Sequence, residues 1–325
     1  MKNLYFILIL ALFGQVSSAN EVNVYTSRHY DSDPGLYQEF TNETGVKVNI
    51  ISGKGSALLE RIKAEGKNSP ADIFFTVDAG NLWKVQKENL LQSITSTKVL
   101  DSVPDNLKGP DNQWTAIAKR ARAIFYNPLM VEETEINNLN YEDLADSKWK
   151  NRIVIRSSNN MYNQSLVASL IANLGETQTE SWAKKLVSNF ARKPQGNDRS
   201  QIMAVANGEA DIAIANSYYI GIMLSGSAGE EQLNAAKKVK MLFPNQDNRG
   251  VHINISGAGI LKYAPNVDNA NLFLEFLLSK KAQKYMVEKS YEYPILEGIL
   301  PSKEIASFGL NFVEDQISVK QFGEL

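Results

Sequence analysis

Phenol side chains are the groups in this sequence whose type and spacing could do chemistry. Tyr30, Tyr162 and the adjacent pair Tyr218 and Tyr219 each stand in a polar stretch or directly after an apolar one. A phenolate is a hard anionic oxygen ligand, the kind that a small trivalent cation such as ferric iron prefers. A free phenol has a pKa of about 10, but a bound cation favours the deprotonated form. Three or four phenolates would balance a triple positive charge.

The adjacent tyrosines also have an ordinary explanation. Neighbouring aromatic residues often pack with one ring in the core and the other at the surface. Taken alone, Tyr218 and Tyr219 favour that packing interpretation. A metal site requires the tyrosine-bearing segments to converge, which depends on the elements that position them.

Strands and helices alternate along the chain, as in α/β proteins. Each of these tyrosines is predicted to stand in a loop that follows a strand, and the carboxyl ends of strands are where open α/β sheets bind ligands. The first strand, helix and second strand form a βαβ unit, which predicts parallel pairing of the two strands. The pattern predicts strands at 21–26, 46–51, 71–77, 114–127, 152–156, 212–215 and 251–261, and helices at 34–44, at a segment ending at 63, and at 81–89, 164–174, 180–190, 200–207, 266–278 and 281–289.

The residues of most enzyme sites are missing. The sequence has no cysteine, only two histidines (His29 and His252), and no Walker loop, nucleophile elbow or zinc-protease motif. The Gly-Lys-Gly-Ser turn at 53–56 could bind an oxyanion at a helix start, although an ordinary strand-to-helix turn explains it better. His252 falls inside a predicted strand, so we expect it to be packed or hydrogen-bonded and not a ligand.

The first 19 residues indicate export. Lys2, an apolar run over residues 4–13, and the small residues Ser17 and Ala19 form the pattern of a signal peptide cleaved after Ala19. No later stretch is apolar enough to span a bilayer, and no cysteine could carry a lipid anchor. The mature chain would have 33 basic and 36 acidic residues, because the removed segment holds one lysine and no acid. This balance gives no sign of nucleic-acid binding.

Six groups of short motifs follow one another in a characteristic order along nearly all of the mature chain. They are VYTSRHY at 24–30, PADIF at 70–74, RSS at 156–158 with YNQS at 162–165, PQGND at 194–198, GEADIAIANSYY at 208–219 and NISGAG at 254–259. A single piece such as Gly-Glu-Ala-Asp occurs across many solute-binding proteins, but the joint order with the tyrosine pair is specific. The sequence resembles the ferric-iron-binding proteins of bacterial ABC transporters, especially the tyrosine-rich subgroup found in cyanobacteria.

The resemblance implies an α/β, two-lobed periplasmic-binding-protein fold of type II, with a hinge and an interlobe cleft. We expect a first lobe of residues 20–119 plus about 250–297, and a second lobe of about 120–249 plus about 298–325. The long strand predicted at 114–127 would then run from one lobe to the other.

The resemblance also implies ligand roles for single residues. Tyr218 and Tyr219 match the paired tyrosines of the family, Tyr162 matches the additional tyrosine of the subgroup, and Tyr30 matches the tyrosine that closes from the first lobe. His29 belongs to the same loop as Tyr30. Family members differ in whether this histidine reaches the metal, so ligation and an outer role for His29 both stay open.

The same resemblance implies that the protein would bind Fe³⁺ as its transported ligand in the periplasm and deliver it, as a monomer, to an ABC transporter permease in the inner membrane. It would not be an enzyme. Arg122, on the lobe-crossing strand, could hold the phenolates in place or form a surface ion pair. Two alternatives are a binder of an oxyanion, a polyamine or a thiamine-like solute that uses the turn at 53–56, and a secreted transferase or hydrolase with Asp72, Asp78 or Asp198 as base.

Overall fold

A computed structural model describes residues 20–318, 321 and 325. The predicted signal peptide, residues 1–19, lies outside the described residues. The strands are β1 (Glu21–Thr26), β2 (Lys47–Ser52), β3 (Ile73–Val77), β4 (Leu91–Gln92), β5 (Trp114–Tyr126), β6 (Ile153–Val154), β7 (Ile212–Asn216), β8 (Lys240–Leu242) and β9 (Ile253–Leu261). The helices are α1 (Asp33–Thr44), α2 (Gly55–Glu65), α3 (Ala79–Lys87), α4 (Thr97–Asp101), α5 (Glu133–Ile136), α6 (Met161–Leu174), α7 (Glu176–Ser188), α8 (Asp198–Ala206), α9 (Tyr218–Leu224), α10 (Glu230–Ala236), α11 (Val267–Leu277), α12 (Lys280–Lys289) and α13 (Lys303–Ala306).

The strands form one mixed sheet in the order β2-β1-β3-β9-β5-β7-β6, with β4 beside β9 and β8 beside β5. The predicted parallel pairing of β1 with β2 is confirmed, and β7 with β6 is parallel as well. The first part of β5 pairs with β9, and its last five residues pair with β7. A single strand therefore joins the two ends of the sheet.

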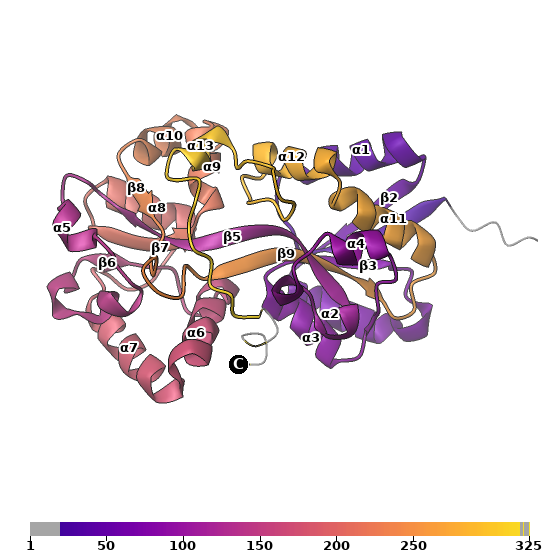
Figure 1. The fold of residues 1–325 in the computed structure, drawn as a ribbon, viewed down its shortest axis with the longest axis horizontal. Helices are drawn as coiled ribbons and strands as arrows, with labels where there is room; N and C mark the ends of the chain where they lie inside the picture. Colours follow the sequence, from indigo (N-terminus) through magenta and orange to yellow (C-terminus); the bar gives the residue numbers. More distant parts are fainter. Residues whose placement is uncertain (1–19, 319–320, 322–324) are drawn as a thin grey trace, which may run out of the picture.

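The apolar core is divided between the two ends of the sheet, which β5 joins. One core cluster lies around β1, β3 and β9 and is covered by α1, α11 and α12 (Figure 1). Two further clusters lie around β7 and the far part of β5, among α6, α8 and α9. In Figure 1, β5 and β9 cross the middle between these two groups of helices. Two packed halves joined by extended strands are the arrangement of a hinge between lobes.

All the predicted strands and helices are present, with ends shifted by a few residues. The sequence pattern did not predict β4, β8, α4, α5, α9, α10 and α13, which are short and have weak periodic patterns. His252 lies just before β9 and not inside it. No helix within the described ranges has the length and apolar character needed to cross a bilayer.

Candidate metal centre

The loop after β1 contains Tyr30 and is held in place by buried ion pairs. Arg28 donates two hydrogen bonds to Asp33, both at 2.9 Å, and one to Glu292 at 3.0 Å. The Arg28 guanidinium also lies 4.4 Å from the ring centroid of Tyr30. Burial alone would raise the pKa of Glu292, but Arg28 and Arg120 outweigh burial and lower it. Glu292 is therefore a buried carboxylate anchor for the tyrosine-bearing loop.

Tyr218 and Tyr219 begin helix α9 directly after β7. The prediction that they stand in a loop is wrong, because both residues lie in the first turn of this helix. Their ring centroids are 4.1 Å apart. The ring of Tyr30 meets Tyr218 edge-on, with centroids 5.4 Å apart. Tyrosines from the two halves of the molecule are thus in contact.

Tyr162 lies in the first turn of α6. The predicted loop at this position is also wrong, because the helix begins at Met161 and the Asn160 side chain caps it by accepting a hydrogen bond from the Tyr162 N–H at 3.0 Å. The guanidinium groups of Arg120 and Arg156 lie 5.3 and 5.4 Å from the Tyr162 ring centroid. The side chains of Tyr162 and Tyr218 are close enough for each to influence the pKa of the other.

All four phenols are shielded from water, and burial raises the pKa of each one. Among the described residues, the hydroxyls of Tyr30 and Tyr218 have no hydrogen-bond partner of good geometry. Buried polar groups in native proteins are nearly always hydrogen-bonded, so two such hydroxyls on rings in contact make this cluster a candidate ligand site. A cation there would stabilise the phenolates that burial otherwise disfavours.

Arg122 lies behind the tyrosines and not at the surface. Its buried guanidinium pairs with Asp198 at 2.5 Å, and donates to Asn216 at 3.2 Å and to Asn163 at 2.6 Å. The surface ion pair considered from the sequence is therefore excluded. Asn163 follows Tyr162 directly and Asn216 ends the strand before the tyrosine pair, so Arg122 ties two tyrosine-bearing segments together.

Arg120 is a functional candidate that the sequence analysis missed. It is buried on β5 and lowers the pKa of three of the four phenols, against the larger effect of burial. Its Nη1 donates to Ser256 at 3.2 Å and to Glu292 at 3.4 Å. Its spacing from Arg122 could have identified it. Residues two apart on a strand lie on the same face, and Arg122 was already a candidate.

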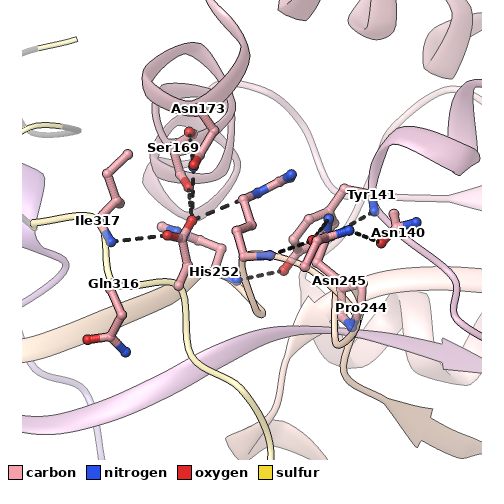
Figure 2. A network of polar contacts seen from close by, with 12 residues as sticks. Asn140, Tyr141, Ser169, Asn173, Pro244, Asn245, His252, Gln316 and Ile317 are labelled. Atoms are coloured by element: carbon pink, nitrogen blue, oxygen red, sulfur yellow. Dashed lines mark hydrogen bonds and ion pairs between the residues drawn. The ribbon is translucent and has the colours of Figure 1, made fainter.

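The two histidines differ in their surroundings. His29 is exposed and stacks on Tyr30, with ring centroids 5.3 Å apart. Loss of solvent around the ring, and then the positive charges of Arg120 and Arg28, lower the pKa of His29 and favour the neutral imidazole, the form that binds metal ions. His252 is packed beside Tyr141, to whose hydroxyl oxygen its backbone N–H donates at 3.3 Å (Figure 2). Burial lowers the pKa of His252 to about 3.

A cleft of about 750 Å³ opens beside the tyrosine cluster. His29, Tyr162 and Tyr219 line it, together with the turn at 53–56 and basic side chains, which are Lys54, Lys84, Arg156 and Arg199. Within the part of the chain that the structure describes, no three His, Asp or Glu residues form a cluster able to hold a metal ion. Asp78 also lines the cleft, but the basic side chains outnumber it, and the phenols are the candidate ligands for a cation here.

Two packed halves, a hinge of extended strands and a cleft between the halves define a class of binding proteins. Residues 27–284 match the bacterial extracellular solute-binding protein family, and the chain belongs to this family.

Several relatives have names that refer to iron. The chain is 50% identical to iron uptake protein A1 of Synechocystis over 303 residues, which are 93% of this chain and 83% of the relative. It is 50% identical to the solved structure of Trichodesmium IdiA (FutA) in complex with iron and citrate, with a TM-score of 0.88 over 94% of this chain and 95% of that chain. A ferric binding protein from Campylobacter jejuni has a TM-score of 0.88 at 41% identity, over 93% and 95% of the two chains. The fold is therefore the two-lobed, type II fold of periplasmic binding proteins.

Proposed function

We propose that this protein binds ferric iron in the cleft and delivers it to an ABC transporter permease. The observation that carries the proposal is the convergence of four buried phenols from three separate segments, Tyr30, Tyr162, Tyr218 and Tyr219. Phenolate oxygen suits a hard trivalent cation, and four phenolates would neutralise it without an added anion. The names of the relatives from Synechocystis and Campylobacter jejuni, which refer to iron uptake and ferric binding, support the same ligand.

The four tyrosines are the proposed ligands. His29 is a further candidate, since its neutral ring stacks on Tyr30 at the cleft. Arg122 acts by holding Asn163 and Asn216, the neighbours of the ligands.

The proposed lobes are residues 20–119 with about 250–297, and about 120–249 with about 298–325. Ala118 belongs to the core cluster of the first half and Ala121 to a cluster of the second, which supports a lobe boundary near residue 119. Iron bound from both sides would favour the closed arrangement of the lobes over the open one.

Transport, and not catalysis, is the proposed role. The three carboxylates considered as catalytic bases are occupied by structural hydrogen bonds. Asp72 accepts from the Asn266 N–H at 2.7 Å, Asp78 from the Ser165 hydroxyl at 2.8 Å, and Asp198 from the Asn216 N–H at 2.9 Å. A base that is saturated by donors has little capacity to take a proton from a substrate.

A tyrosinate-to-iron charge-transfer band would test the proposal directly. Purified protein loaded with ferric iron should be coloured, and a strong chelator should bleach it. A protein that takes up ferric iron without any visible band would contradict tyrosinate ligation.

Acidification should release the iron. The ligands are phenolates in the complex and phenols in the metal-free protein, whose pKa values burial raises. Each ligand therefore takes up a proton when iron leaves, so binding weakens as the pH falls. A spectroscopic titration should show cooperative loss of colour. Retention of full absorbance from neutral pH down to about pH 3 would contradict this prediction.

Export with cleavage after Ala19 is part of the proposal, as are periplasmic location, a monomeric state and a permease partner in the inner membrane. The mature protein should begin at Asn20, because Ser17 and Ala19 are the small residues that signal peptidase requires. Mass spectrometry of the exported protein will measure this. A soluble exported species that keeps residues 1–19 would contradict it.

A further inference from the structure

Asp78 stands at the turn from β3 to α3 in a backbone conformation that L residues rarely adopt, with φ 79° and ψ 125°. Its side chain is fully buried. Glycine would take this conformation at lower cost. A carboxylate retained here must form contacts that offset both the strain and the desolvation.

These contacts join the two halves of the molecule. The Asp78 carboxylate accepts the Ser165 hydroxyl at 2.8 and 2.9 Å, and the Asn254 side-chain N–H at 2.8 Å. It also accepts the Gly80 N–H at 2.9 Å. Ser165 belongs to α6 in the second half, and Asn254 belongs to β9, one of the two crossing strands. Every partner is a donor, which suits an ionised carboxylate.

Ser165 is one helical turn after Tyr162 on α6, so the two side chains lie on adjacent parts of one face. We propose that Asp78 is a positioning residue, which docks the first turn of α6 through Ser165 and thereby places the Tyr162 phenol in the tyrosine cluster. The inference rests on the proposed function, because the position of Tyr162 matters only if its phenol binds iron.

The rest of α6 has a different anchor. Ser169 and Asn173 continue the same face at intervals of four residues and donate to the Asp315 carboxylate at 3.3 and 3.0 Å (Figure 2). This second anchor acts further along α6, away from Tyr162. Ser165 and Ser169 are therefore a matched pair: each is a buried serine on one helix, bonded to a carboxylate from outside the helix.

The experiment compares Ser165→Ala with Ser169→Ala in the iron-loaded mature protein. Transfer of iron to a competing chelator and the position of the charge-transfer band are measured for both. Ser165→Ala should release iron about tenfold faster than wild type and shift the band, because a hydrogen bond to a charged group is lost. Ser169→Ala should match the wild type. Thermal melting of both variants checks that the fold is retained.

Asp78→Gly supplies an independent arm, since glycine tolerates the backbone conformation. If Asp78 acts through Ser165, the double variant should release iron no faster than Asp78→Gly alone. The inference would be overturned if Ser165→Ala released iron at the wild-type rate, or if Ser169→Ala accelerated iron release as much as Ser165→Ala. Absence of a band in the wild-type protein would instead overturn the proposed function.

Discussion

Tyr218→Phe and Tyr219→Phe are each expected to weaken ferric iron binding by about 100-fold or more, since loss of a partner outside the ligand shell already costs about 10- to 100-fold. The two residues occupy adjacent positions in the first turn of α9, with ring centroids 4.1 Å apart. They can present two anionic oxygens without any movement of the lobes. We therefore expect them to capture the metal first.

The same substitutions should leave the metal-free protein folded. The Tyr218 hydroxyl is buried without a well-formed hydrogen bond among the described residues, so its removal relieves a desolvation cost while the ring stays to pack. The melting temperature of metal-free Tyr218→Phe should equal or slightly exceed that of wild type. Affinity is measured by competition with a chelator of known strength. Wild-type affinity in both variants would reduce the pair to packing residues and remove the functional assignment.

Tyr30→Phe is expected to leave weak iron binding to a more open protein. Tyr30 comes from the loop after β1 and reaches Tyr218 across the boundary between the halves. Its binding energy is partly offset by the cost of closing the cleft, so its loss should affect closure more than first capture. Small-angle scattering with and without iron measures this difference. Wild type should become more compact on binding, and the variant should compact less.

The metal-free protein serves as the control for the Tyr30 experiment, because the ion pairs that hold the loop do not involve Tyr30. The Tyr30 hydroxyl takes no part in the ion pairs of Arg28 with Asp33 and Glu292. The metal-free scattering of Tyr30→Phe should thus match that of metal-free wild type. Full compaction of the variant with iron would show that Tyr30 does not close the cleft.

Much of the fold could be predicted because periodic patterns act over short distances. The helix at Asp33–Thr44 carries Pro34 in its first turn and Gly45 in a left-handed conformation after its end, so local signals mark both boundaries. The first turns of α6 and α9 were not recognised: the capping residue Asn160 marks the start of α6, whereas α9 has no side-chain cap. Their tyrosines were assigned to loops, because Tyr218-Tyr219-Ile220 looks no more helical than extended when its packing partners are unknown.

The electrostatics of the site could be predicted only in part. Arg122 was selected for its strand, but its partner Asp198 comes from a distant helix that the sequence does not place beside it. Arg120 was missed although it is the cation that acts on three phenols. No local pattern distinguishes Arg120 from Arg122. Which of the two influences the phenols depends on the side chains that β9 and the Glu292 segment bring near β5.

The sequence by itself determined which residue types are available: tyrosines as hard oxygen ligands, no thiols, few histidines, and alternating strands and helices that put each tyrosine after a strand. Those properties are local and follow from composition and period. Only the tertiary structure decided that the phenols meet, that two of their hydroxyls are buried without good partners among the described residues, that Arg120 lies near them, and that Asp78 bonds Ser165. The reason is that burial and electrostatic coupling arise from contacts between segments far apart in the chain, which no local pattern encodes.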